Sequence, residues 1–261
     1  MGAKDLIIRP VSPKIANEFI KRTHYSKKVA ATSLLHMGVY WHGKLEGAIQ
    51  LGRPIAKRAM LGLVSSTRWN GMLELNRLAF TDRLPRNSES RAISVAFKVL
   101  KKHRPDIEWV VSFADGCQCG DGAIYRASGF VLTDIRTNKG LIRLPSGEVV
   151  HQMAYAGGHY SRRRKEMLRA GYCKWKDYLN ATQEGWKYIP GFQLRYIYFL
   201  DPTARERLTV PILPFSEIQR RGAGMYLGEK RAGSDTGDTS SLQDGKGGSI
   251  PTSALTKTSH A

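Results

Sequence analysis

The sequence predicts an α/β fold in which helices flank a mixed central β-sheet. Three observations favour it. Apolar segments of strand length alternate with segments whose apolar residues recur every three or four positions, one apolar segment is continuous enough to be buried on both faces, and two pairs of strands are joined by hairpin turns. The chain has 261 residues, 41% of them hydrophobic, which is enough apolar material for one large core or two small ones.

The first predicted elements are a strand, a helix and a β-hairpin. A short apolar run ends at Pro10, and Ser12 then caps a helix that begins at Pro13, because proline is favoured in the first helical turn. Two further apolar segments are joined by the polar turn His42-Gly43-Lys44, which is typical of an antiparallel hairpin. The three strands are expected over residues 6–9, 36–41 and 45–51.

The middle of the chain predicts two strand–helix units. Residues 72–80 form a strand, and a turn-rich stretch leads into a helix that carries Ile93, Ala96, Phe97 and Leu100 at helical spacing. Residues 107–114 are almost entirely apolar, as in a strand covered on both faces. A glycine-rich loop then leads into a short helix over residues 124–127.

The remaining elements are strands and one strongly basic helix. Strands are expected over 130–135, 140–144 and 149–155, the last two joined by Pro145-Ser146-Gly147, and a final strand over 194–200. The basic helix covers 161–170 and ends at Gly171. Gly, Ser, Thr, Asp and Pro dominate from residue 229 onward. We therefore expect one folded domain over 1–228, with a basic helical insertion, and a disordered low-complexity tail over 229–261.

The charge of the chain indicates a polyanionic partner. Lys and Arg number 41 against 22 Asp and Glu, a net charge of +19, and residues 229–261 are neutral, so the excess lies on the first 228 residues. Three cysteines do not make a disulfide framework and suit a reducing compartment. No run of about 18 apolar residues occurs. These features predict a soluble intracellular protein without membrane contact.

Clusters of basic residues are the candidate nucleic-acid contacts. The helix over 161–170 combines positive charge with nearby aromatic residues, a mixture suited to phosphate binding and base stacking. For any single cluster the alternative is a solvated charged face. The candidates are Lys27, Lys28, Arg53, Arg162, Arg163, Arg164, Lys165 and Arg169.

The end of the buried strand is the candidate catalytic edge. Ser112 and Asp115 lie where open α/β sheets place their ligands, and Asp115 is the best placed acid–base group or metal ligand. The alternative is that Asp115 caps the following turn. Tyr125, in the next helix, either packs in the core or points its hydroxyl into the same cleft.

Two His-Tyr-Ser sequences, at 24–26 and 159–161, place an imidazole beside a phenol. Catalysis and simple hydrogen bonding by loop residues are the two interpretations of this pattern.

The stretch before the second long helix is the candidate cofactor site. Coenzyme A enzymes of this fold hold pyrophosphate there on glycine-rich backbone, but residues 83–90 contain no glycine. A helix N-terminus with flanking arginines still offers an anion site, and its candidate residues are Arg83, Arg86, Asn87 and Ser88.

Taken in order, several segments resemble the Mom family of bacteriophage DNA-modification proteins. They are His24-Tyr25-Ser26, Glu74-Leu75-Asn76-Arg77-Leu78, Ser112-Phe113-Ala114-Asp115, residues 122–128 (Gly-Ala-Ile-Tyr-Arg-Ala-Ser) and residues 195–199 (Arg-Tyr-Ile-Tyr-Phe). The likeness spans roughly residues 15–200, and its most specific part is the Ala-Asp loop followed by Ile-Tyr-x-Ala.

The resemblance implies an acetyltransferase-like (GNAT-like) fold that converts adenine in double-stranded DNA to a carbamoylmethylated N6 form, which host restriction enzymes no longer cut. By this analogy His24, Tyr25, Asp115 and Tyr125 line the active cleft, with Ser112 and Arg77 in support. The resemblance also raises iron as a cofactor, with His24, Tyr25 and Asp115 as ligands, since imidazole, phenolate and carboxylate make an iron-binding set. The expected compartment is the host cytoplasm.

Alternatives remain at this point. Cys119-Gly120-Asp121 departs from the family's loop after the aspartate, which leaves a different ligand set or transferred group open. The rival functions are an acetyl-coenzyme A dependent acetyltransferase acting on a hypermodified pyrimidine in phage DNA, and a non-catalytic DNA-binding protein. The acyl donor and the oligomeric state, homodimer included, also stay open.

Overall fold

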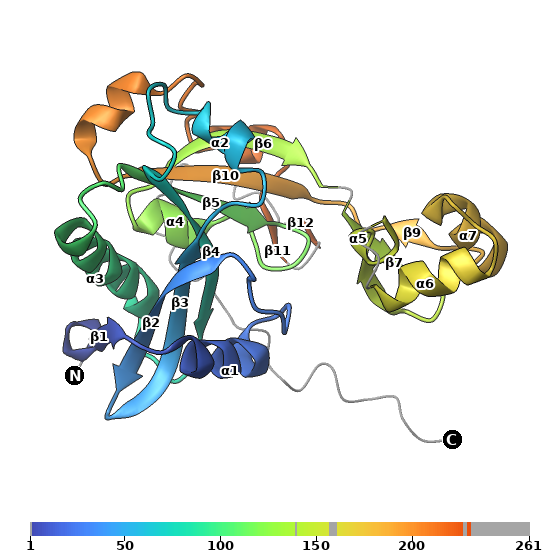
Figure 1. The fold of residues 1–261 in the computed structure, drawn as a ribbon, viewed down its shortest axis with the longest axis horizontal. Coiled ribbons are helices and arrows are strands. Elements are labelled where there is room, and N and C mark those ends of the chain that lie inside the picture. The colour runs from blue at the N-terminus through green and yellow to red at the C-terminus, as the bar shows by residue number, and fades with distance from the viewer. Residues whose placement is uncertain (1, 139, 157–160, 227–228, 231–261) are drawn as a thin grey trace.

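The computed structural model describes residues 2–138, 140–156, 161–226 and 229–230. Within them, seven strands form one mixed sheet in the order β1-β2-β3-β4-β5-β10-β6 (Figure 1). The strands are β1 (Ile7–Pro10), β2 (Ser33–Trp41), β3 (Lys44–Gly52), β4 (Met72–Phe80), β5 (Trp109–Asp115), β6 (Val131–Thr137) and β10 (Phe192–Phe199). Of the pairs in this sheet, β4 with β5 is parallel and the others are antiparallel. This arrangement confirms the predicted α/β class with a mixed central sheet.

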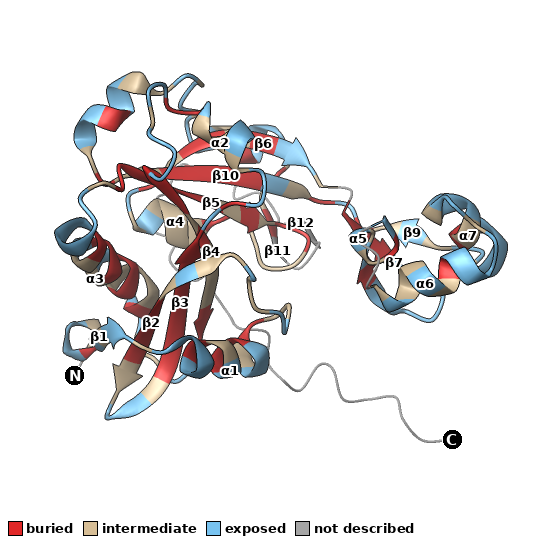
Figure 2. Cartoon of the chain, in the orientation of Figure 1, coloured by how far each residue is buried: buried red, intermediate tan, exposed pale blue. Residues whose placement is uncertain are grey.

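Helices cover both faces of the sheet. Helices α3 (Ser88–His103) and α4 (Ala123–Ala127) lie on one face, while α1 (Pro13–Thr23), α2 (Lys57–Leu61) and the 3-10 helix η2 (Pro202–Arg207) lie on the other. Alternate residues of β5 therefore enter different cores: Val110 packs with α3, whereas Trp109 and Val111 pack towards α2 and η2. Figure 2 shows that buried residues follow the central strands. The continuous apolar run over 107–114 reflects this two-sided burial.

The two parallel strands separate after a short paired stretch. Their register runs from Met72 opposite Trp109 to Glu74 opposite Val111. Beyond that point β4 continues against β3 and β5 continues against β10. The carboxyl end of β5 is thus released from its parallel neighbour, and the side chains that follow Val111 have room for partners from other elements.

The segment between β6 and β10 folds as a separate unit, which we call the insertion (residues 138–191). It contains a small sheet of β7 (Leu141–Arg143), β8 (Val149–His151) and β9 (Lys187–Tyr188), with α5 (Met153–Ala156), α6 (Arg162–Arg169) and α7 (Trp175–Thr182). The insertion has its own apolar core, which includes Ile142, Tyr155, Met167 and Leu179. Figure 1 shows it extending to one side of the main sheet.

Most predicted elements are confirmed, with local corrections. The Oγ of Ser12 accepts the N–H of Ile15 and caps α1, and the β2–β3 hairpin turns at His42-Gly43, both with positive φ. The strand expected over 149–155 ends at His151, because the chain then turns into α5 and buries Tyr155 in the insertion core. Helices α2 and α7, not anticipated from the sequence, are only one or two turns long.

The chain does not end its regular structure with β10. It continues through the 3-10 helix η2, α8 (Ser216–Arg220), β11 (Met225–Tyr226) and β12 (Glu229–Lys230), and the first residues also form a 3-10 helix, η1 (Ala3–Asp5). The strand predicted over 194–200 is present as β10, but the prediction that it is the last strand was wrong. Residues 231–261 of the predicted tail lie outside the described residues, as do His159 and Tyr160 of the second His-Tyr-Ser. No helix in the described part of the chain has the length and apolar character needed to span a bilayer.

Candidate active site

Asp115 is held in place by donors from three directions. Its Oδ1 accepts the backbone N–H of Cys117 at 3.0 Å and the Nδ2 of Asn138 at 2.9 Å, and its Oδ2 accepts the Nε2 of Gln118 at 3.3 Å. Its side chain is half-buried, at the end of β5. Because every one of these contacts donates to the carboxylate, Asp115 is arranged as an acceptor. The turn-capping role predicted as its alternative is present too, in its bond from Cys117.

The end of α1 brings His24 and Tyr25 beside this carboxylate. The helix stops at Thr23, and the rings of His24 and Tyr25 then lie 4.1 Å apart, centre to centre. The hydroxyl of Tyr25 hydrogen-bonds to Cys119, and burial, reinforced by the negative charge of Asp115, raises the pKa of Tyr25. The phenol therefore stays protonated at neutral pH.

His24 is neutral and its tautomer is fixed. The side chain is buried, and burial, helped by the charges of Arg77 and Lys27, lowers its pKa to about 3. Its Nδ1 accepts the backbone N–H of Ser26 at 3.1 Å. Since a backbone N–H only donates, the single proton of the neutral ring sits on Nε2. His24 thus presents an N–H donor rather than a lone pair.

Ser112 and Tyr125 complete the site across the split between β4 and β5. The buried Ser112 hydroxyl lies 3.3 Å from the carbonyl oxygen of Leu75 on β4 and also hydrogen-bonds to the hydroxyl of Tyr125 on α4. The Tyr125 ring packs against Tyr196 and Phe130, and burial raises its pKa. The ring of Tyr125 is therefore part of the core, and its hydroxyl points to the buried Ser112.

Cys119 is a member of the site that the sequence prediction did not assign. Its thiol donates to the carbonyl oxygen of Asp115 at 3.3 Å, and burial raises its pKa, so it is a thiol rather than a thiolate.

Glu74 lies close to the hydroxyl of Tyr125, and burial raises its pKa as well. A carboxylate inside the apolar run Met72-Leu73-Glu74-Leu75 was the sequence signal that could have found it.

The insertion also reaches the site. Asn138 stands at its first residue, and His151 on β8 is close enough to Asp115 and Lys28 for both charges to act on its pKa, which burial lowers. The carbonyl oxygen of Lys28 in turn accepts the Nε of Arg77 at 2.9 Å. The loop after α1, the end of β5 and the base of the insertion therefore meet at one place.

The sequence profile of the Mom protein family matches residues 5–217 of the chain. The methylcarbamoylase Mom of Escherichia phage Mu is 35% identical over 212 residues, which is 81% of this chain and 82% of that protein. The chain belongs to the Mom protein family. The resemblance stated from the sequence motifs is confirmed.

Solved structures of acetyltransferases also align with the chain, with low TM-scores. The ribosomal-protein-S18-alanine N-acetyltransferase of Escherichia coli shares 9% identity at a TM-score of 0.40 and covers 75% of this chain and 94% of its own. A Bacillus subtilis acetyltransferase in complex with CoA shares 11% identity at a TM-score of 0.40, with coverages of 75% and 99%.

One of the predicted iron ligands, His24, does not fit a metal ion as it is arranged here. Its Nδ1 is occupied by the N–H of Ser26, so its Nε2 carries the ring proton. The described residues contain no group of three or more His, Cys, Asp or Glu side chains placed to bind a metal ion. In this tautomer His24 offers no lone pair to iron, and iron binding by His24, Tyr25 and Asp115 stays a prediction.

Of the four residues predicted to bind coenzyme A, two are bonded to other parts of the protein and two line a hollow at the surface. Arg83 forms an ion pair with the buried Glu46 at 3.0 Å, and Ser88 is fully buried with its hydroxyl on the carbonyl oxygen of Pro85. Arg86 and Asn87 line a surface hollow of about 750 Å³ beside η1 and α4. The carboxylate of Glu89 folds back onto its own N–H in the first turn of α3. Burial raises the pKa of this carboxyl group, and residues 83–90 contain no glycine to let the backbone approach a pyrophosphate, so coenzyme A binding by Arg83, Arg86, Asn87 and Ser88 stays a prediction.

The predicted DNA-contact residues fall into two groups. Lys27 and Lys28 follow His24 at the site itself, and Arg53 is exposed after β3. The others lie on α6 in the insertion, where Arg162, Lys165 and Arg169 are exposed, while Arg163 and Arg164 are half-buried and bonded within the insertion.

Proposed function

We propose that the chain is a phage DNA-modifying transferase that attaches a small carbamoylmethyl or other acyl-type group to the exocyclic N6 amine of adenine, and so protects phage DNA from host restriction. Its substrate is double-stranded DNA in the host cytoplasm. The observation that carries the proposal is the convergence of Tyr25, Ser112, Asp115 and Tyr125 at the split between β4 and β5. Membership of the Mom protein family supports it, since the phage Mu relative is a methylcarbamoylase.

In this proposal the basic residues hold the phosphates and a base is extruded towards Asp115. Extrusion costs a few kcal/mol, which phosphate contacts by Lys27, Lys28 and α6 offset. The amine nitrogen forms a bond to the reacting carbon of an activated donor, which is the methylene carbon of a carbamoylmethyl group or the carbonyl carbon of an acyl group. The bond from that carbon to its leaving group breaks, the leaving group keeps the electron pair, and Asp115 accepts the proton released by the amine.

The neutral hydrogen-bond donors of the site suit the substrate that supplies the transferred group. Tyr25 keeps its proton because its pKa is raised, and the N–H on Nε2 of His24 is a further donor. Hydrogen bonds from such groups stabilise negative charge that develops on an acyl oxygen in the transition state. His24 and Tyr25 are therefore assigned to orient and activate the donor, and Ser112 positions Tyr125.

The test is the mass profile of nucleosides from cells that express the chain. We expect an adenosine of increased mass with the wild-type chain, none with Asp115→Ala, and the wild-type amount with Asp106→Ala, a control aspartate that precedes β5 and is paired with Arg104. An acetylated pyrimidine instead would support the rival acetyltransferase. Unchanged nucleosides together with tight DNA binding would support a non-catalytic DNA-binding protein.

A further inference from the structure

A cavity of about 360 Å³ lies in the insertion, apart from the site at Asp115. It is lined by residues of α5, α6, α7 and the turn between the last two: Tyr155, Ala156, Arg164, Met167, Cys173, Lys174, Trp175, Lys176 and Asp177. None of these residues belongs to the candidate active site. The volume is in the range of small-molecule sites in proteins.

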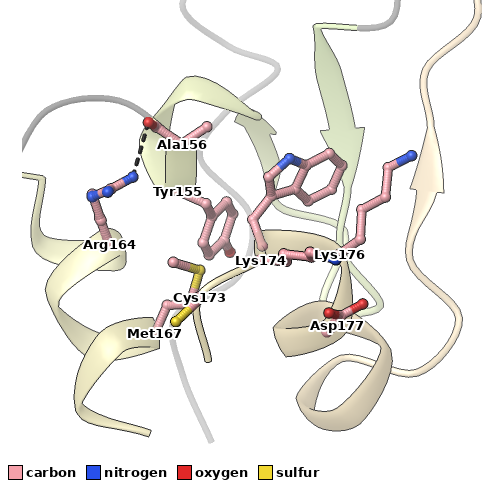
Figure 3. Close-up of a pocket in the computed structure, with 9 residues that line it drawn as sticks. Tyr155, Ala156, Arg164, Met167, Cys173, Lys174, Lys176 and Asp177 are labelled. Atoms are coloured by element: carbon pink, nitrogen blue, oxygen red, sulfur yellow. Dashed lines mark hydrogen bonds between the residues drawn. The ribbon is translucent and has the colours of Figure 1, made fainter. Parts of the chain in front are cut away.

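The lining combines apolar residues with positive charge. Tyr155, Met167 and Cys173 lie together between Arg164 and Lys174 (Figure 3). Tyr155 and Met167 are buried and form the floor, whereas Trp175 is only half-buried, and its ring can contact a planar ligand. Three cationic side chains face one carboxylate, that of Asp177. A planar ligand attached to an anion suits this composition better than a purely apolar one.

Arg164 supplies a donor without a partner. Its Nη1 donates to the carbonyl oxygen of Ala156 at 3.0 Å, the dashed line in Figure 3. Its Nε is buried from solvent and finds no acceptor among the described residues. Arg164 also lines the cavity, and the N–H groups of a guanidinium match the acceptor atoms on the edge of a nucleobase.

The basic helix beside the cavity points to a strand of DNA. Arg162, Lys165 and Arg169 are exposed on α6, the helix that contributes Arg164 and Met167 to the cavity. The insertion as a whole carries ten Lys and Arg against four Asp and Glu. Phosphates lying along α6 would bring the bases of the same strand to the cavity mouth.

We propose that this cavity holds an unpaired nucleobase of the DNA strand whose phosphates lie along α6. The proposal rests on the proposed function, since the enzyme must open the duplex to reach an adenine amine. A second base bound in the insertion would hold the opened strand while the target base is at Asp115. The cavity is thus a DNA-binding site, separate from catalysis.

Cys173 is exposed at the cavity, so the rate at which it is alkylated reports whether the cavity is occupied. The full chain is alkylated with N-ethylmaleimide, and the Cys173 peptide is quantified by mass spectrometry with a 12-nucleotide single-stranded DNA or an abasic strand of equal length, each at saturating concentration. We expect the strand with bases to slow alkylation about tenfold relative to the abasic strand, a ratio in the range that base stacking supplies. Equal protection by both strands, or by neither, overturns the proposal. Protection by deoxyadenosine monophosphate but not by the strand would mean a free nucleotide site and also overturns it.

A cavity-filling variant gives an independent readout. Cys173→Phe should weaken binding of the base-containing strand about tenfold and leave the abasic strand unchanged, while the control Cys173→Ser binds both as wild type does. Thermal unfolding of each variant shows that the insertion is folded. Equal weakening of both strands by Cys173→Phe contradicts a base in the cavity.

The nucleoside mass profile separates this inference from the proposed function. If adenosine is unmodified in expressing cells, the proposed function fails, whatever happens at Cys173. If adenosine is modified but abasic DNA protects Cys173 as well as normal DNA does, only the cavity assignment fails.

Discussion

At the scale of single residues, Asp115 depends on a neighbour from another element. The Nδ2 of Asn138 donates to its Oδ1 at 2.9 Å, and the Oδ1 of Asn138 accepts the backbone N–H of Gly140 at 2.8 Å. The second bond fixes which end of the amide faces the carboxylate. Asn138 is therefore a positioning residue for the proposed proton acceptor.

Replacing Asn138 should impair turnover more than DNA binding. In Asn138→Ala the carboxylate is free to rotate, and we expect kcat for base modification to fall about 10- to 100-fold while Kd for DNA changes little. The control is Asn180→Ala, which removes an amide bonded to Trp186 inside the insertion. Equal losses in the two variants would mean that Asn138 acts only on stability.

Burial of a neutral His24 should make the fold sensitive to acid. The folded-state pKa of about 3 lies below the ordinary value of 6.5, so below pH 6.5 the unfolded chain takes up a proton that the folded chain does not. The stability contributed by His24 is present above pH 6.5 and falls by up to about 1.4 kcal/mol per pH unit as pH drops towards 3.

The measurement is urea unfolding at pH 7 and pH 5. His24→Gln should lose less stability between these two values than wild type does, while His103→Gln, a control histidine exposed at the end of α3, should behave as wild type. The same pH dependence in all three proteins would contradict a buried neutral His24.

At the scale of elements, α6 divides its arginines between two tasks. Arg163 bonds to the hydroxyl of Tyr155 and pairs with Glu148, so it fastens the helix to the insertion. Arg162 and Arg169 are exposed, and Arg162 has an i,i+4 ion pair with Glu166. The run of four basic residues in the sequence does not show which arginine has which task. That depends on how the helix is rotated about its axis relative to the insertion core.

Variants of α6 should separate DNA binding from stability. Arg162→Ala with Arg169→Ala should reduce the slope of log Kd against log salt by about 0.9 for each phosphate that the helix no longer binds, without changing the melting temperature. Arg163→Ala should instead destabilise the insertion by about 1 kcal/mol. Fluorescence anisotropy over a NaCl series and thermal unfolding measure the two effects. An unchanged salt slope would remove α6 from the DNA surface.

At the scale of the whole molecule, the insertion is anchored at a narrow base. The N–H of Asn138 donates to the carbonyl oxygen of Gly191 at 2.8 Å, and the N–H of Ile189 donates to that of Leu141 at 3.0 Å. The main sheet and the insertion have separate apolar cores. The central fold therefore does not need the interior of the insertion for its own packing.

Replacing residues 142–188 by a short Gly-Ser linker should leave the main sheet folded. The linker spans a gap whose ends are already hydrogen-bonded, so we expect a cooperative melting transition and near-native circular dichroism. DNA affinity should fall at least about tenfold, because the basic helix and the proposed base cavity are removed. Wild-type affinity in the shortened chain would place the DNA surface on the core instead, at Lys27, Lys28 and Arg53.

Local patterns were sufficient for the elements of the main sheet. Helical spacing in α3, the two-residue turn between β2 and β3 and the apolar run of β5 each follow from near neighbours in the chain. Short helices such as α2 were missed, because so few turns carry too little periodicity to distinguish them from loops.

The sequence by itself determined the class of fold, the basic surface, the family and the carboxylate at the end of β5, because each depends on residues close together in the chain. Only the tertiary structure decided that β10 pairs between β5 and β6, that Cys119, Asn138 and His151 gather around Asp115 with Glu74 near Tyr125, and which arginines of α6 face solvent. Those facts depend on contacts between distant segments, which form when the strands find their partners, and no local pattern specifies them.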